Sequence, residues 1–383
     1  MNLNIILIII LFFIFNYMYI CRYTDNKSIK EMFSSISSIK EIANSKIDTQ
    51  IPSYLNKYFR KIEYKTFSSK QIKPNGKIFI SIASYRDPQC PLTILDAITK
   101  ASKPENLVIV ICQQNDHLDV SCEISDTHTR GATIKYIKMP HTEARGPCWA
   151  RFAITQLWDG EEYYLQIDSH TRFVDSWDTK CISGLIQAQE IASNPLVCLT
   201  NYVSTFNIST GDIEINPLRG PMYVESIDQT DGFDRYNSKY SSLMLKPLES
   251  KGWSGCFAFG SAQMLIDAPY DPYTPFLFFG EEMDMFARLY TRGWVMYVPH
   301  IPICFTIFDR SYRKTFWEHP DQAEIVPWSK IRLYERFGIL MEKFVNKIPS
   351  EVLLDKEKFS LGTVKTFKQF IEYSSHKLDS IQG

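Results

Sequence analysis

The sequence predicts an α/β fold in which parallel strands alternate with helices along the chain. Short apolar runs of strand length stand at 77–83, 107–112, 134–137 and 163–167. Two stretches of helical length, 91–102 and 148–158, lie among them. This rhythm is typical of a sheet whose parallel strands are joined by right-handed crossovers. Ligands of such sheets bind beyond the carboxyl ends of the strands, where functional residues are therefore expected.

The N-terminal part of the chain is predicted to be a membrane anchor followed by a stem. Residues 3–20 are almost wholly apolar, which is just long enough for a short transmembrane helix. The segment lacks the charged start and small-residue cleavage site of a signal peptide, so we expect an uncleaved signal anchor at 1–21. Residues 22–75, rich in Ser, Lys and Ile, are typical of a stem.

The orientation of this single-pass anchor is left open by two opposing signals. Arg22, Lys27 and Lys30 directly follow the apolar run, and the positive-inside rule would keep that side cytosolic. Asn26 and Asn207 each begin an Asn-x-Ser glycosylation sequon that only a lumenal domain uses. We expect a catalytic domain in the lumen of the endoplasmic reticulum or Golgi, with a cytosolic orientation as the alternative.

Composition excludes some classes of partner and of metal site. The 45% hydrophobic and 22% charged residues are ordinary for a globular protein. A net charge of −1 shows no excess of positive charge that would favour binding to nucleic acid. The nine cysteines contain no CxxC pair or Cys/His cluster, which argues against structural zinc. Cys112 and Cys122 flank a short segment and are candidates for a disulfide in an oxidising compartment.

A candidate metal site follows the apolar run at 163–167. Asp168 and His170 are two residues apart, so their side chains point to the same side of an extended turn. A carboxylate and an imidazole suit Mn²⁺ or a similar ion, which would neutralise the diphosphate leaving from a nucleotide sugar. An Asp-x-His triplet alone is a weak signal, and the alternative is a solvent-facing strand end.

Candidate residues for a nucleotide donor lie in two loops and at one helix entry. The loops 84–87 and 113–116 follow the first two predicted strands and should rim one crevice. The segment 145–151 enters the helix that precedes the candidate metal site, where guanidinium groups and a helix N-terminus suit a diphosphate. The alternative for this segment is surface ion pairing. The candidates are Ser84, Arg86, Asp87, Gln113, Arg145 and Arg151.

Two carboxylates later in the chain are candidates for the acceptor side. The aromatic run 276–279 is predicted to be a strand, and it leads into Glu281 and Glu282 at the start of a helix that Gly293 closes. One interpretation is that a carboxylate faces the crevice and orients an acceptor hydroxyl or sugar. The alternative is that both stabilise the helix dipole. Nearby aromatics are either a stacking wall for sugars or core: Trp253, Phe257, Trp294 and Trp317.

Taken together, the motifs resemble a known enzyme family. They are, in order, Ser81–Pro88, Ala144–Pro147, Gln166–His170, Pro269–Pro272 and Phe278–Glu282. This order and spacing is similar to the GT60 glycosyltransferases, which include polypeptide α-N-acetylglucosaminyltransferases that modify hydroxyproline or threonine. The resemblance implies a GT-A fold, which is a Rossmann-like mixed sheet flanked by helices. It also implies a UDP-GlcNAc donor, a divalent metal such as Mn²⁺, and retention of anomeric configuration.

The resemblance also implies domain limits and roles for particular residues. It covers about 76–318 as the catalytic domain, which leaves 319–383 as a helical extension. Asp168 and His170 would bind the metal, and Arg151 would reach the diphosphate or donor sugar. The loop containing Arg86 and Asp87 would meet the nucleotide, and the paired glutamates would lie on the acceptor side. A similarity to polypeptide N-acetylgalactosaminyltransferases in the Asp-x-His triplet leaves open which N-acetylhexosamine the donor carries.

One position departs from the family pattern. Similar sequences place a histidine, the third metal ligand, four residues before Arg310, where this chain has Thr306. Water, Asp309 or His300 are alternatives for that ligand. The expected function is transfer of GlcNAc to a protein or glycoprotein hydroxyl. The alternative is a catalytically degenerate relative that binds a nucleotide sugar or a glycoprotein without transfer.

Overall fold

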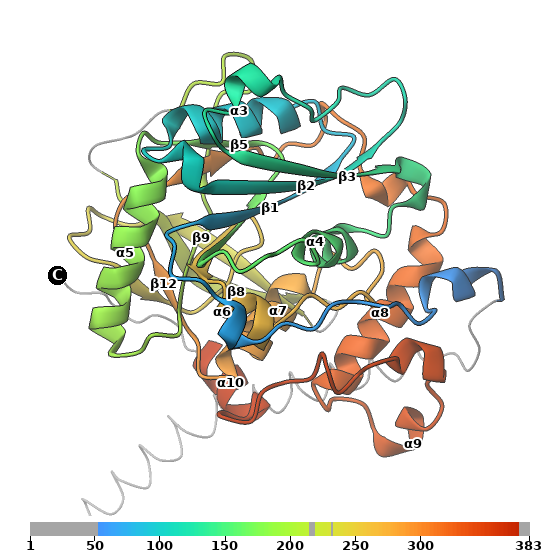
Figure 1. Ribbon diagram of the computed structural model, residues 1–383. Coiled ribbons are helices and arrows are strands. Elements are labelled where there is room, and N and C mark those ends of the chain that lie inside the picture. The colour runs from blue at the N-terminus through green and yellow to red at the C-terminus, as the bar shows by residue number, and fades with distance from the viewer. Residues whose placement is uncertain (1–52, 214–218, 231–232, 375–383) are drawn as a thin grey trace, which may run out of the picture.

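The computed structural model describes residues 53–213, 219–230 and 233–374 (Figure 1). The predicted anchor at 1–21 and most of the predicted stem lie outside these residues. Within the described ranges, no helix combines the length and apolarity needed to cross a membrane.

A mixed sheet of eight strands forms the centre of the molecule. In spatial order it consists of β10 (Leu248–Ser250), β12 (Val295–Val298), β6 (Val197–Thr200), β11 (Phe257–Ser261), β4 (Tyr163–Asp168), β1 (Ile78–Tyr85), β2 (Leu107–Asn115) and β3 (Thr133–Pro140). The four predicted strands are confirmed as β1 to β4, and they pair in parallel. β11 runs antiparallel between β4 and β6, which makes the sheet mixed.

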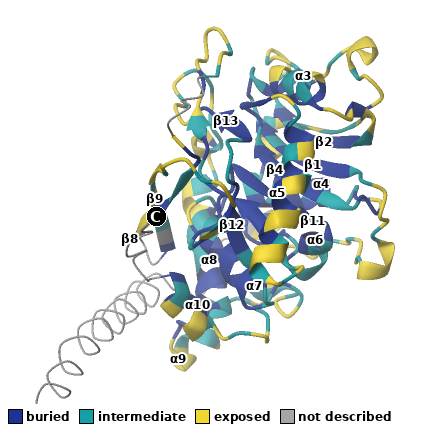
Figure 2. Ribbon diagram, turned by 90° about the vertical axis from the view of Figure 1, so that its left-hand side faces the viewer, coloured by how far each residue is buried: buried dark blue, intermediate teal, exposed yellow. Residues whose placement is uncertain are grey.

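Helices cover both faces of this sheet (Figure 1). α3 (Cys90–Lys100) and α5 (Trp177–Ala192) pack on one face, while α4 (Pro147–Thr155), α6 (Gln263–Asp267) and α7 (Glu281–Tyr290) pack on the other. Successive strand residues point to opposite faces of the sheet, so Ile80 packs in the core on the α3 face and Phe79 packs in the core on the α4 face. The central strands are buried between these helix layers (Figure 2). The architecture is therefore the predicted α/β class.

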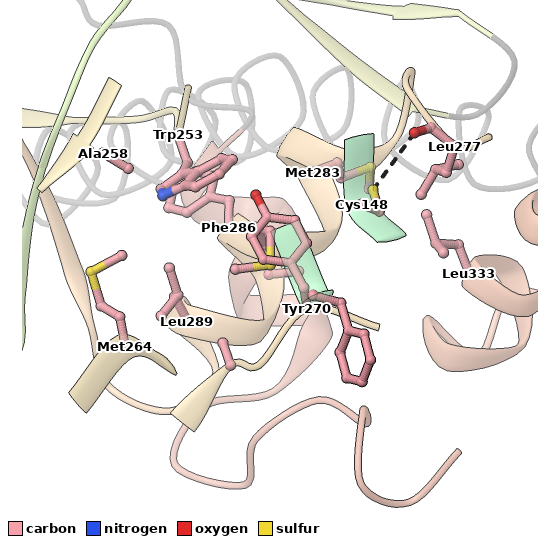
Figure 3. Packing of buried hydrophobic residues seen from close by; sticks show 14 of the residues in the cluster. Cys148, Trp253, Ala258, Met264, Tyr270, Leu277, Met283, Phe286, Leu289 and Leu333 are labelled. Atoms are coloured by element: carbon pink, nitrogen blue, oxygen red, sulfur yellow. Dashed lines mark hydrogen bonds between the residues drawn. The ribbon is translucent and has the colours of Figure 1, made fainter. Parts of the chain in front are cut away.

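The C-terminal helices α8 (Gln322–Arg336), α9 (Glu342–Val345) and α10 (Phe367–Ser374) follow the sheet in the chain. α10 packs on α7, where Phe370 lies edge-on to Phe286 with ring centroids 5.1 Å apart. Figure 3 shows Met283, Phe286 and Leu289 of α7 among Trp253, Tyr270 and Leu333. The carboxylates at the start of α7 thus stand on a helix whose other face is fixed in the core.

Two smaller sheets complete the fold. One contains β5 (Thr171–Phe173), β13 (Cys304–Thr306) and β7 (Ser204–Thr205), and it carries the chain directly after His170. The other is the hairpin of β8 (Met222–Thr230) and β9 (Phe233–Tyr240). β9 contacts α7, so this hairpin reaches the same end of the molecule as the paired glutamates.

The structure corrects two expectations. The aromatic run 276–279 is a loop and not a strand: Phe276 has a left-handed φ of 58° and its N–H donates to the carbonyl of Arg145 at 2.6 Å. Nearby prolines remove ladder donors, which disfavours strand pairing there. The disulfide joins Cys122 to Cys90, not to Cys112. Cys112 is buried with the α4-side core, on the opposite face of the sheet from both bridged cysteines.

Candidate active site

A cavity of about 350 Å³ opens beyond the carboxyl ends of β1, β2 and β4, which is a volume typical of small-molecule sites. Its charged and amide side chains come from six separate parts of the chain. These side chains are Gln114, Arg151, Asp168, His170, Arg235, Glu281, Glu282, Arg310 and Arg313. Aromatic side chains of the segments 278–279 and 308–317 line the rest. The sheet therefore gathers the predicted metal pair and both predicted glutamates around one space.

His170 is held in a fixed orientation by a buried carboxylate. Its Nδ1 lies 2.7 Å from Asp87 Oδ2, and Asp87 is only 1% exposed. Ser169 Oγ donates to the same oxygen at 2.6 Å. Burial alone would raise the pKa of Asp87, but the hydrogen bond from His170 and the charge of Arg313 lower it to about 2. Asp87 is thus ionised and fixes the His170 proton on Nδ1, leaving Nε2 free.

The free nitrogen of His170 faces the carboxylate of Asp168. His170 Nε2 and Asp168 Oδ2 are 3.8 Å apart. Ligand distances of roughly 2.0–2.3 Å put two ligands of one divalent ion at most about 4.5 Å apart, so this pair fits such an ion. An imidazole nitrogen, a carboxylate oxygen and a second carboxylate behind the imidazole form a donor set that suits Mn²⁺.

No third protein ligand completes this pair among the described residues, where no cluster of three or more His, Cys, Asp or Glu is arranged to hold a metal. Thr306 is fully buried, and its hydroxyl donates to the carbonyl of His170 at 3.2 Å. Asp309 instead accepts from the Ser311 hydroxyl at 2.7 Å, and neither Asp309 nor His300 lines the cavity. An ion at this pair would take its other ligands from water and from the substrate.

Arg151 ties three elements together at the floor of the cavity. The guanidinium is 5% exposed and forms an ion pair with Glu281. Its Nη2 lies 3.3 Å from Asp168 Oδ1 and donates to the carbonyl of Gly255 at 3.0 Å. Because Arg151 contacts one oxygen of Asp168, the other oxygen remains directed toward His170. Arg151 therefore lines the cavity mainly as an orienting group for Asp168.

The two predicted glutamates have different surroundings. Glu281 is 4% exposed, pairs with Arg151, and accepts a hydrogen bond from Tyr270 Oη at 2.7 Å. These contacts occupy the Glu281 carboxylate at the bottom of the cavity. Glu282 is half-buried and accepts hydrogen bonds from Tyr202 Oη and from the N–H of Gly255, the latter at 2.9 Å. Of the two, Glu282 has the surface left to contact a substrate.

Burial raises the pKa of Glu282 to about 7, with a smaller rise from the negative charges of Glu281 and Asp168. The hydrogen bonds from Tyr202 and Gly255 act in the other direction and lower it. A carboxyl that changes charge near neutral pH inside a cavity is a recurrent feature of functional sites.

The structure places five predicted donor residues outside the cavity lining. Arg86 Nε contacts Asp119 Oδ2 at 2.7 Å, and Gln113 Oε1 accepts from the N–H of Cys122 at 2.8 Å. The Arg145 guanidinium lies over the rings of Tyr58 and Trp149, at 5.7 and 5.4 Å from their centroids. Asp87 acts behind His170, and Ser84 is fully buried. Alternation along β1 and β2 explains the placement of Ser84 and Gln113, because their sequence neighbours Tyr85 and Gln114 face the cavity instead. Of the predicted donor set, Arg151 alone lines it.

Three cationic residues of the lining were missed by the sequence analysis. The Arg310 guanidinium lies between the rings of Phe278 and Trp317, at 5.2 and 4.9 Å from their centroids. Arg313 Nε stands 3.5 Å from Asp87 Oδ2. Arg235 comes from the β8–β9 hairpin. In the sequence, the one indication of these residues is the basic run 310–314. Whether this run faces the cavity depends on where the preceding strand ends, which the sequence does not show.

The aromatic residues divide between the two roles that were weighed for them. Trp253, Phe257 and Trp294 are at most 1% exposed and belong to the core. Trp317 is 37% exposed and lines the cavity. The aromatic lining near Trp317 is therefore formed together with Phe278 and Phe279, and the sugar-stacking role stays a prediction.

Comparisons with solved structures find low similarity to several glycosyltransferases. GalNAc-T7 with UDP, GalNAc and Mn²⁺ is 14% identical, with 79% of this chain and 55% of that chain covered and a TM-score of 0.47. Staphylococcus aureus TarS 1–349 in complex with UDP-GlcNAc is 13% identical, with coverages of 71% and 72% and a TM-score of 0.42. The chain spans about half the length of the GalNAc-T7 chain.

A third structure, the mannosyltransferase PcManGT from Pyrobaculum calidifontis with GDP-Man and Mn²⁺, is 10% identical, with coverages of 82% and 85% and a TM-score of 0.36. A search of curated protein sequences found no match. The decisive comparison is with the profile of the glycosyltransferase (GlcNAc) family, which matches residues 77–131 and 124–380. These ranges take in every polar residue of the cavity and most of the sequence. The chain therefore belongs to the glycosyltransferase (GlcNAc) family.

Proposed function

We propose that the protein transfers GlcNAc from UDP-GlcNAc to a hydroxyl of a protein, with a divalent ion and with retention of anomeric configuration. The family assignment supports GlcNAc as the sugar. The observation that carries the proposal is the pair Asp168 and His170, with Asp87 fixing the imidazole so that its free nitrogen faces the carboxylate in the cavity. The acceptor is a Thr, Ser or hydroxyproline side chain.

The donor end of the cavity is assigned to the side of Asp168 and His170. A divalent ion such as Mn²⁺ bound there supplies positive charge for the diphosphate as it leaves. Arg310 and Arg313 stand on the same side and add cationic hydrogen-bond donors for phosphate oxygens. Arg151 keeps Asp168 oriented by its contact with Oδ1. The protein thus contributes positioning and charge stabilisation where negative charge develops.

The acceptor end is assigned to Glu282. As a carboxylate it accepts a hydrogen bond from the acceptor hydroxyl and orients the oxygen toward the anomeric carbon. That oxygen bonds to the anomeric carbon as the bond to the diphosphate breaks, and the acceptor proton passes to the departing diphosphate. Glu281 is engaged by Arg151 and Tyr270, which supports attack from the leaving-group face over a covalent carboxylate intermediate.

The test is donor turnover with a matched triplet as control. Asp168→Ala/His170→Ala should abolish Mn²⁺-dependent release of UDP from UDP-GlcNAc. The same substitutions at the exposed triplet Asp126-Thr127-His128, which lies outside the cavity, should leave release unchanged. Unaltered turnover in the 168/170 variant would refute the proposal.

A degenerate, non-transferring protein is the second candidate, favoured by Thr306 in place of a histidine and by the missing third ligand in the described part of the chain. Under this alternative UDP binds but neither hydrolysis nor transfer occurs at saturating Mn²⁺. Restoring the family residue with Thr306→His would then create activity.

We also propose that the chain is anchored in a membrane and that its catalytic domain faces the lumen of the secretory pathway. Two observations support this: the Cys90–Cys122 disulfide, which suits an oxidising compartment, and the exposed sequon residue Asn207. In cells, glycosidase treatment should lower the mass of the wild-type protein by the glycan on Asn207, and Asn207→Gln should abolish this part of the decrease. Unbridged Cys90 and Cys122 thiols in the cellular protein would contradict the lumenal orientation.

A further inference from the structure

Three large aromatic side chains are exposed around the mouth of the cavity. Phe279, Phe308 and Trp317 are 41%, 42% and 37% exposed, and all three line the cavity. Aromatic surface left in contact with water beside a polar site is typical of a binding surface. A patch of this kind at the opening suits the part of a substrate that remains outside.

Arg235 of β9 is stacked on this aromatic patch. Its guanidinium carbon lies 3.8 Å from the ring centroid of Phe279, and the side chain lines the cavity. Its Nε is shielded from solvent without a hydrogen-bond partner, and Arg235 forms no ion pair with any carboxylate whose side chain the structure describes. A guanidinium held flat on a ring keeps its edge donors free for a carboxylate. An unmet buried donor also costs free energy that a ligand oxygen would recover.

Contacts along the lining place Arg235 at the acceptor end. From the metal pair, Arg310 leads to Phe278, whose ring centroid is 5.0 Å from that of Phe279. Arg235 lies beyond Phe279. Its neighbour in the chain, Tyr236, has its ring 6.4 Å from Tyr202, which donates to Glu282. Arg235 and Glu282 thus line the same cavity, and the rings of Phe278 and Phe279 separate Arg235 from the diphosphate side.

We propose that Arg235 and Phe279 form an acceptor subsite that selects peptides with an acidic residue beside the glycosylated hydroxyl. The inference rests on the proposed function and specifies its acceptor. The peptide carboxylate would bind the free edge of Arg235, and the adjoining backbone would lie along Phe279 and Phe308. A peptide fits because the cavity holds the donor and the open aromatic patch at its mouth suits an extended chain.

The experiment uses the full-length enzyme and defined peptide pools. Each pool contains a central Thr, Ser or hydroxyproline with either Glu or its neutral isostere Gln at each flanking position. Transfer of labelled GlcNAc from UDP-GlcNAc gives kcat/KM for every pair. Arg235→Met removes the charge and keeps a long apolar stem over Phe279. Lys239→Met is the matched control, because Lys239 is on the same strand but pairs with Glu225 and does not line the cavity.

The wild-type enzyme should prefer Glu over Gln by about 10-fold or more at one flanking position, as expected for a charge-assisted hydrogen bond. Arg235→Met should bring this ratio close to one by raising the KM for the peptide, with UDP binding unchanged, and Lys239→Met should retain the preference. A wild-type enzyme that is indifferent to Glu, or an Arg235→Met enzyme that still prefers it, overturns the inference. UDP binding with no transfer to any pool also overturns it, whereas absent UDP binding overturns the proposed function itself.

Discussion

Replacing Glu282 with Gln tests the electrostatics of the cavity without removing its hydrogen bonds. In the wild-type protein Glu282 accepts from the N–H of Gly255 and from Tyr202. A glutamine oxygen can accept from Gly255, and its amide can donate to the Tyr202 oxygen. The substitution therefore changes the charge and little else.

The expected effect follows from the raised pKa of this carboxyl. Burial raises the pKa of Glu282 from 4.5 to about 7, so the folded protein binds its proton more tightly than the unfolded chain. At about 1.4 kcal/mol for each pH unit, the difference corresponds to about 3 kcal/mol. This contribution to the free energy of unfolding is fully present below pH 4.5 and is lost as the pH rises to about 7. Glu282→Gln should abolish the loss.

The assay is urea unfolding followed by tryptophan fluorescence at pH 5 and pH 8. The free energy of unfolding of Glu282→Gln, measured relative to wild type, should be about 2–3 kcal/mol higher at pH 8 than at pH 5. Glu190→Gln, at an exposed position of α5, should follow the wild-type pH dependence. If Glu282→Gln instead follows the wild-type curve, the carboxyl is not buried against the other acids as described.

Two further predictions concern the groups that support the site. Asp87→Asn leaves His170 in place but removes the carboxylate that fixes its proton, so Mn²⁺ affinity by calorimetry should fall about 10- to 100-fold; unchanged affinity would exclude this role. Gly146→Ala should lower the free energy of unfolding by more than about 2 kcal/mol in urea, since a Cβ there would stand 2.6 Å from Phe276 Cα and φ is 83°. A neutral effect would show that the loop 276–279 does not pack as described.

The sequence predicts the half of the sheet formed by β1 to β4 because each strand is a short apolar run followed by polar residues. It also predicts that Asp168 and His170 lie side by side, since Asp168 ends such a run and strand geometry alone puts His170 on the same side. Glu281 and Glu282 were found by their place at a helix start. These features depend on local pattern, and local pattern is readable without knowledge of the packing.

Features that depend on packing between distant segments could not be predicted. Whether Ser84 or Tyr85 faces the cavity is decided by which face of β1 is covered by α4, and a shift of one residue inverts the answer. The choice of Cys90 over Cys112 as partner of Cys122 has the same origin. The place of Arg235 in the cavity lining requires the β8–β9 hairpin to contact α7, and no periodicity in the sequence indicates that contact.

Calorimetric titration of UDP into the full-length protein, with and without Mn²⁺, tests the central claim most directly. Asp168 and His170 should make nucleotide binding depend on the ion, so wild-type protein should bind UDP tightly only when Mn²⁺ is present, and Asp168→Ala/His170→Ala should bind it equally weakly in both conditions. UDP binding that is independent of Mn²⁺ in the wild-type protein, or Mn²⁺-dependent binding that survives in the double variant, would contradict the account.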